Sequence, residues 1–96
     1  MIVLAATMRA KAGKEEEFVA VMSGLVKAVR ANEPGALDYT LHRSKKDART
    51  FLVYEKYRDQ AAMTAHMTSA HFQEASKKLK ELVEGAMGLE MYEVVA

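Results

Sequence analysis

Two histidines and one glutamate are the side chains whose types and spacing best fit proton-transfer chemistry. His66 lies three residues after Met63, so the two share one apolar stripe if this segment is a short helix. A histidine that faces a sheet beside an apolar pocket can take a proton from a phenol or an enol near neutral pH. The alternative is a partly exposed helix residue, and the sequence leaves both readings of His66 open.

Glu55 lies in the segment with the strongest strand composition, on the face that also carries Phe51 and Val53. A carboxylate among apolar groups needs a hydrogen-bonding or charged partner. Glu55 therefore either orients His66 or a substrate hydroxyl, or makes a salt bridge or hydrogen bond across a dimer interface.

The remaining candidates for a substrate site are aromatic residues, methionines and a second histidine. His71 is expected just inside the next helix, where a structural role in capping is favoured over a place at the mouth of a pocket. Methionines fill cores more often than they line adaptable pockets. The candidates for contact with a substrate are His71, Phe72, Tyr39, Tyr54, Tyr57, Met22 and Met63.

Other kinds of chemistry have little support. The absence of cysteine excludes a cysteine nucleophile, a thiolate zinc site and an iron–sulfur cluster, and the serines lack the context of a nucleophile elbow. No glycine pattern fits a dinucleotide site, so we expect no flavin or nicotinamide cofactor. His66 and His71 are five residues apart across a helix break, and His42 lies on a distant strand, so we also expect no metal site.

Composition limits the partners of the chain. Its 96 residues carry 14 Lys and Arg against 13 Asp and Glu, and half of them are hydrophobic, which is typical of one small folded domain over residues 1–96. Because basic and acidic residues are interleaved, we expect no nucleic-acid binding. The apolar run at residues 1–8 is too short for a membrane span and lacks the flanks of a signal peptide. With no cysteine, the cytoplasm is the expected location.

Hydrophobic periodicity predicts the elements that position these residues. Apolar residues from Phe18 to Val29 recur at helical spacing in a helix that begins at Glu15 and is stopped by residues 32–35. Asp59 and Ser69 are plausible N-caps of two later helices. The patterns predict strands over residues 2–10, 36–43, 50–57 and 89–95, and the two later helices over residues 60–67 and 70–84.

This order predicts an α+β domain with the ferredoxin-like βαββαβ arrangement, in which the helices cover one face of an antiparallel sheet. The strands nevertheless carry apolar residues on both faces, as in Phe51 and Val53 against Leu52 and Tyr54. A half-exposed sheet should be polar outside, so a second copy is expected to cover that face. We therefore expect a homodimer that forms a dimeric α+β barrel.

The stretch from Val53 to Gln73 resembles the antibiotic biosynthesis monooxygenase (ABM) family. It contains a strand bearing a glutamate with an aromatic residue two positions later, an Asp-led short helix with a histidine, and the pair His71-Phe72. The corner Glu33-Pro34-Gly35-Ala36, where most relatives have Glu-x-Gly-Cys, and Tyr39 also match, so the resemblance covers essentially the whole chain. It is more specific for the fold than for a reaction.

The resemblance implies several activities. The leading hypothesis is a cofactor-independent monooxygenase of small aromatic, quinol-like substrates such as hydroquinones or anthrones, with His66 as the base. The first alternative is an isomerase of a small phosphorylated sugar-like metabolite, for which Lys56 and Arg58 are the nearby cations. The second is a non-catalytic dimer that binds a small molecule. The haem-degrading branch relies on a tryptophan, which this sequence lacks.

Overall fold

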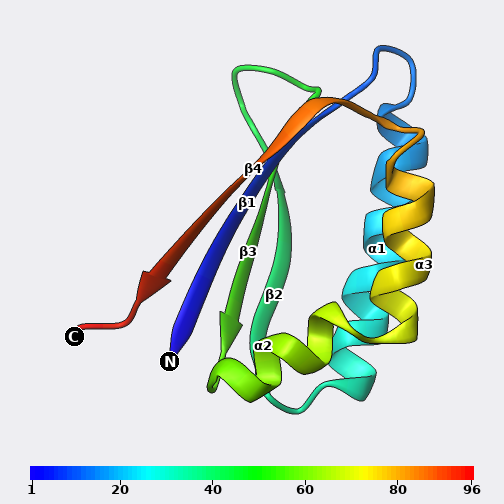
Figure 1. The fold of residues 1–96 in the computed structure, drawn as a ribbon. Coiled ribbons are helices and arrows are strands. Elements are labelled where there is room, and N and C mark those ends of the chain that lie inside the picture. Colours follow the sequence, from blue (N-terminus) through cyan, green and yellow to red (C-terminus); the bar gives the residue numbers. More distant parts are fainter.

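A computed structural model describes residues 1–96 as a four-stranded antiparallel sheet with three helices on one side (Figure 1). The sheet has the strand order β2-β3-β1-β4 of the expected ferredoxin-like arrangement, so the α+β fold class is confirmed. None of the helices combines the length and the apolar content that crossing a membrane requires. The elements are β1 (Ile2–Ala10), α1 (Glu15–Asn32), β2 (Ala36–Arg43), β3 (Thr50–Tyr57), α2 (Gln60–Met67), α3 (Ala70–Leu79) and β4 (Val83–Glu93).

The core lies between the sheet and α1. Helix α1 buries its apolar stripe, which includes Phe18, and carries three glutamates in its first turn, where they favour the positive end of the helix dipole. Strand β3 alternates strictly between buried and half-buried residues, as predicted, and its Phe51 packs against Phe18 with 4.5 Å between ring centroids. Residues 51, 53, 55 and 57 of β3 therefore face the helices.

The predicted boundary between the last helix and the last strand was wrong. Helix α3 ends at Leu79 rather than near residue 84, and β4 begins at Val83 rather than at residue 89. Helical spacing of Leu79, Leu82 and Val83 suggested a longer helix, but the Lys11 N–H donates to the carbonyl of Leu82 at 2.8 Å and Val83 pairs with Ala10. Sheet pairing thus overrides the local pattern. Gly85, at a φ of 70°, lies in the irregular stretch that follows.

A bulge in β2 corrects a second expectation. The alternation of residues 36–43 predicts that Leu37 lies on the same face of the strand as Tyr39 and Leu41. In the structure Ala36 pairs with Tyr57 and Asp38 with Lys56, so Leu37 is the extra residue of an irregular pairing and is 47% exposed. Tyr39 keeps its buried place beside Glu55.

The face of the sheet that carries no helix is apolar in part. Val3, Ala5, Leu52 and Tyr54 alternate with the buried residues and stay half-exposed, and the edge strand β4 leaves Tyr92 51% exposed. Figure 1 shows that all three helices lie on the opposite side and that β4 runs from the end of α3 away from the helices toward the C-terminus.

The corner between α1 and β2 is packed tightly against α2. Its Gly35 carbonyl accepts a hydrogen bond from the Arg58 N–H at 2.9 Å, at the end of β3. A Cβ atom on Gly35 would lie 2.6 Å from the Cβ of Ala62, which is closer than two carbon atoms can approach. A glycine here therefore lets α2 lie against the corner that carries Glu33.

We expect Gly35→Ala to lower the free energy of unfolding by about 1–3 kcal/mol, because the added methyl group must push α2 away from the corner. The matched control is Gly24→Ala, in the middle of α1, where no atom lies within 4 Å of the added Cβ. That change should raise stability by about 0.5–1 kcal/mol through helix propensity. Urea unfolding followed by circular dichroism measures both; equal stabilities of the two variants would contradict this account of the corner.

Candidate active site

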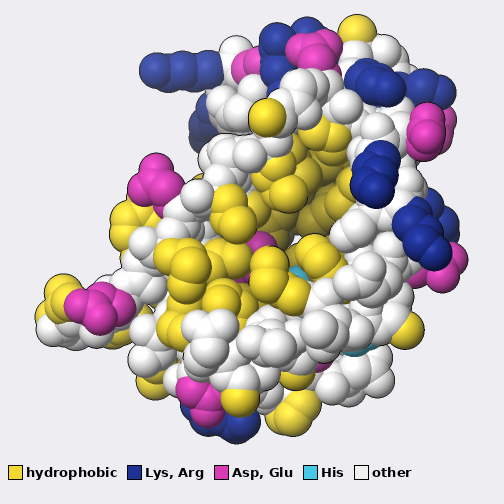
Figure 2. All heavy atoms as spheres, viewed as in Figure 1, with side chains coloured by type: hydrophobic (Ala, Val, Ile, Leu, Met, Phe, Trp, Pro, Cys, Tyr) yellow, Lys and Arg dark blue, Asp and Glu magenta, His cyan; other side chains and the backbone are white.

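A cavity of about 390 Å³ opens between the sheet and helices α1 and α3. Thirteen of its eighteen lining residues are hydrophobic, among them Leu4, Met8, Leu25 and Met87. In Figure 2 this cavity is a hollow with an apolar wall, and acidic and histidine side chains are visible at its lower end. Its size and lining are those of a small-molecule site with few polar groups.

His66 is held at one end of this cavity. Asp59 caps the N-terminus of helix α2, where its side chain accepts a hydrogen bond from the Ala62 N–H at 2.9 Å. Just after the helix ends, the Ser69 hydroxyl donates a hydrogen bond to the His66 carbonyl at 2.6 Å. The His66 residue is only 2% exposed. Aromatic rings surround the imidazole, with centroid distances of 4.7 Å to Phe72, 5.0 Å to Tyr39 and 5.6 Å to Tyr57. Its orientation is therefore fixed by packing.

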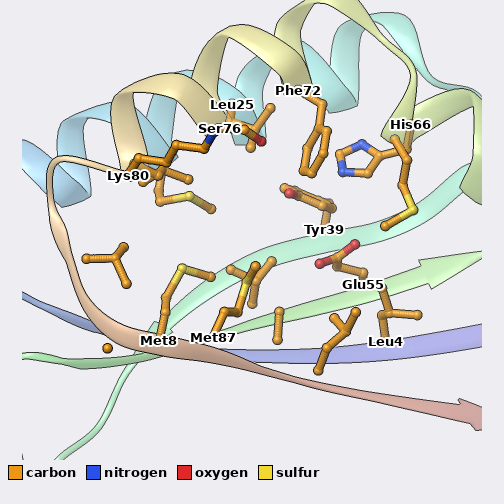
Figure 3. A pocket seen from close by; sticks show the side chains of 18 residues that line it. Leu4, Met8, Leu25, Tyr39, Glu55, His66, Phe72, Ser76, Lys80 and Met87 are labelled. Atoms are coloured by element: carbon orange, nitrogen blue, oxygen red, sulfur yellow. The ribbon is translucent and has the colours of Figure 1, made fainter.

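The carboxylate of Glu33 fixes the protonation pattern of this imidazole. Its Oε2 lies 3.0 Å from Nδ1 of His66 and also contacts Nε2 of His71. Because an ionised carboxylate can only accept a hydrogen bond, Nδ1 of His66 carries the proton and donates the hydrogen bond to Glu33. In the neutral ring Nε2 then keeps a free lone pair, and this buried atom has no hydrogen-bond partner in the protein. Figure 3 shows the ring of His66 directed into the cavity, near Tyr39 and Glu55.

The electrostatic surroundings keep His66 available as a base. Burial lowers the pKa of His66 below its ordinary value of 6.5, and the hydrogen bond to Glu33 opposes only part of that effect. At pH 7 the ring is therefore mostly neutral. When it gains a proton, the adjacent Glu33 carboxylate compensates the new charge.

Glu55 faces the same cavity from β3. Its Oε1 accepts a hydrogen bond from the hydroxyl of Tyr57 at 2.6 Å. Burial raises the pKa of Glu55 to about 7, and the hydrogen bond from Tyr57 offsets part of that rise. At neutral pH the carboxyl group is thus present in both protonation states and can either donate or accept a proton. Burial raises the pKa of Tyr39 far above its ordinary range, so that its hydroxyl stays protonated.

The structure brings together five of the candidate residues: Tyr39, Glu55, His66, Phe72 and Met22 all line the cavity. The other four do not line it. Tyr54 lies on the opposite face of the sheet, while Tyr57 and Met63 are buried in a separate cluster with Leu4. His71 lies behind His66 and contacts Glu33 instead of the cavity.

Sequence reasoning missed Glu33, which contacts His66 in the role proposed for Glu55. It is 33 residues from His66 along the chain, and its place in a helix-ending corner gave no periodic signal. The spacing of His66 and His71 along the chain also gave no sign that the two rings converge on one carboxylate, and the expectation that there is no metal site stays a prediction. Donor atoms of Glu33, His66 and His71 lie within 4.8 Å of one another, a spacing that could also serve a metal ion.

We expect the stability of the protein to depend on pH through Glu55. The raised pKa means that the folded state holds this proton more tightly than the unfolded chain does. The stability that the bound proton contributes is therefore fully present below pH 4.5, and it is lost as the pH rises toward 7. Glutamine does not titrate and still offers an acceptor to the Tyr57 hydroxyl. Glu55→Gln should therefore lose less stability than the wild type as the pH rises, by up to about 3 kcal/mol.

Urea unfolding of the wild type and Glu55→Gln at pH 5 and pH 8 measures this difference. Glu16→Gln is the control, because the side chain of Glu16 is 90% exposed. If the free energy of unfolding changes between pH 5 and pH 8 by the same amount in Glu55→Gln as in the wild type, Glu55 is not a buried, weakly acidic group.

Comparisons with known proteins agree with this fold. The family model for antibiotic biosynthesis monooxygenase matches residues 1–78. A Bacillus subtilis protein named "Putative monooxygenase YcnE" is 40% identical over 87 residues, which are 91% of this chain and 90% of that protein.

Two solved structures superpose closely. A Caulobacter crescentus protein, described as a "putative antibiotic biosynthesis monooxygenase", has 33% identity and a TM-score of 0.95, covering 99% of this chain and 90% of that one. Protein PA3566 from Pseudomonas aeruginosa has 29% identity and a TM-score of 0.90, covering 99% and 94%. The chain therefore belongs to the antibiotic biosynthesis monooxygenase family.

Proposed function

We propose that this protein is a cofactor-independent monooxygenase of small aromatic substrates of the hydroquinone or anthrone type. One observation carries the proposal: Nε2 of His66 is a buried, unpartnered nitrogen of a mostly neutral imidazole, held by Glu33 at the end of an apolar cavity. Such a nitrogen is suited to removing a proton from a weakly acidic aromatic substrate.

The reaction begins when His66 takes a proton from the hydroxyl of a hydroquinone or from the acidic CH₂ group of an anthrone. The resulting electron-rich anion passes one electron to dioxygen, and the substrate radical and superoxide combine into a peroxide. In an anthrone, loss of the second hydrogen of the reacting carbon as a proton then forms the carbonyl and breaks the O–O bond, releasing water. In a hydroquinone, the ring carbon that bears the peroxide loses its only hydrogen in the same way, which gives a hydroxyquinone and water. The CH₂ group supplies all four electrons, so that anthrone and O₂ give anthraquinone and water without another reductant.

The other groups of the site fit the proton movements of this reaction. Glu33 stabilises the imidazolium that forms after the first step. Glu55, with a pKa of about 7, lies in the same cavity and can give a proton to the departing oxygen. The apolar lining keeps water away from the anion.

Hydrogen bonding within the cluster supports a base rather than a metal site. Coordination at Nδ1 of His66 would require that atom to give up its proton and its bond to Glu33. The hydrogen-bonded cluster leaves Nε2 free for the substrate, which is the role that the reaction needs.

The isomerase hypothesis receives less support from the cavity. Lys56 alternates with the inward-facing residues of β3 and so belongs to the sheet face without helices. Arg58 is exposed and lies 3.6 Å from the carboxylate of Asp59. Neither cation lines the cavity, whose largely apolar wall also suits an aromatic ring better than a phosphorylated polyol.

We also propose that the protein is a homodimer in which two sheets pack face to face. The helix-free face carries Val3, Leu52, Tyr54 and Tyr92, and a second copy would remove these apolar side chains from water. The cavity lies on the helix side of the sheet, opposite the face that would pack against the second copy.

Oxygen uptake by metal-free protein with anthrone tests the reaction. We expect uptake well above the spontaneous rate, and a decrease of about 10²–10⁴-fold in His66→Gln because the base is lost. His42→Gln is the control, since His42 is exposed and hydrogen-bonds to Thr40 outside the cavity. EDTA should leave the rate unchanged. The rate should rise with pH through an apparent pKa below 6.5.

A rate that is the same in His66→Gln as in the wild type would contradict His66 as the base. A rate abolished by EDTA and restored by a metal ion would instead assign the cluster of Glu33, His66 and His71 to a metal. Binding of the aromatic compound without any uptake would favour the non-catalytic binding module.

Light scattering tests the dimer. The expected mass is twice that of the 10.7 kDa chain, and Tyr54→Lys should shift the protein toward the monomer because it places a charge in the packed face. Glu74→Lys, on the exposed side of α3, should leave the mass unchanged. A wild-type mass equal to that of one chain would contradict the face-to-face arrangement.

A further inference from the structure

The cavity is chemically different at its two ends. His66, Glu55 and Tyr39 lie at one end, while Ser76 and Lys80 of the last part of α3 lie at the other (Figure 3). The residues between them in the lining are mainly apolar, such as Leu25 and Met8. A long molecule in this cavity would thus meet the proton-transfer groups at one end and a hydroxyl and an ammonium group at the other.

Lys80 is the only lysine or arginine among the lining residues. It is the C-cap residue of α3, and in Figure 3 its side chain extends back toward Ser76 along the cavity. Lys80 is exposed, and no carboxylate lies within salt-bridge distance of its ammonium group. The ammonium group is therefore available to an anion inside the cavity.

The opposite end of the cavity would repel an anion. Glu33 presents a carboxylate behind His66, and Glu55 becomes negative when it loses its proton. An anionic substituent would consequently be placed away from His66 and toward Lys80. This charge distribution would orient an elongated aromatic substrate in one direction.

We propose that the substrate carries a carboxylate at the end remote from its reacting carbon, and that Lys80, with Ser76, recognises this group. The inference rests on the proposed function for the position of the reacting carbon at His66. One ammonium and one hydroxyl fit a carboxylate better than a phosphate, which proteins usually bind with several cations or backbone N–H groups. Lys80 is thus a specificity-determining residue rather than a catalytic one.

Two ligands that differ only in charge test this proposal: anthraquinone-2-carboxylate and anthraquinone-2-carboxamide. At pH 8 and low salt the wild type should bind the carboxylate about fivefold more tightly, the size expected for one partly exposed ion pair. Titration calorimetry gives both dissociation constants. The preference should decrease at high salt, because solvent ions screen an exposed pair.

Variants at position 80 separate recognition from a role in the helix. Lys80→Met should bind the two ligands equally, Lys80→Glu should prefer the carboxamide, and Lys80→Arg should keep the preference for the carboxylate. Lys78→Met, on the same helix but outside this cavity, should behave as the wild type. Circular dichroism confirms that each variant retains its helix.

The outcomes distinguish this inference from the proposed reaction. Equal binding of the two ligands by the wild type, or a preference that survives in Lys80→Met, overturns the role of Lys80 even if anthrone is oxidised. A preference lost in Lys80→Met supports that role even if no oxygen is consumed, and the failure then belongs to the proposed reaction alone.

Discussion

The hydrogen bonds of one buried carboxylate hold the candidate site together. Glu33, with a side chain only 8% exposed, accepts from His66 and contacts His71, and so joins the end of α1 to both later helices. A buried carboxylate requires such partners, and a buried imidazole requires an acceptor for its proton. The contact between Oε2 of Glu33 and Nδ1 of His66 also determines which nitrogen of His66 is left without a partner at the cavity.

The cavity follows from the way the helices cover the sheet. Helix α1 packs closely on β3 through Phe18 and Phe51, whereas β4 forms an edge that runs away from the helices. Met87 and Leu89 of β4 are therefore exposed beside the space between α3 and the sheet. The fold thus leaves an apolar cavity beside β4, while the core between α1 and β3 stays closely packed.

Burial acts in opposite directions on the pKa values of the histidine and the glutamate that line the cavity. It lowers the pKa of His66 and raises that of Glu55, because removal from water disfavours the charged form of each. Near neutral pH the histidine is then free to accept a proton and the glutamate is partly able to donate one. Two ordinary side chains thus reach complementary protonation states through one physical effect, which is also how enzymes separate a catalytic acid from a catalytic base.

The sequence by itself determined the order of the elements, the buried face of α1, and the alternation of β3 with Glu55 on its inward face, because these depend on periodicities of neighbouring residues. Only the tertiary structure decided that Glu33 meets His66 and that Lys80 reaches the cavity. The physical reason is that these contacts join segments far apart in the chain, and local patterns carry no information about which loop packs against which helix.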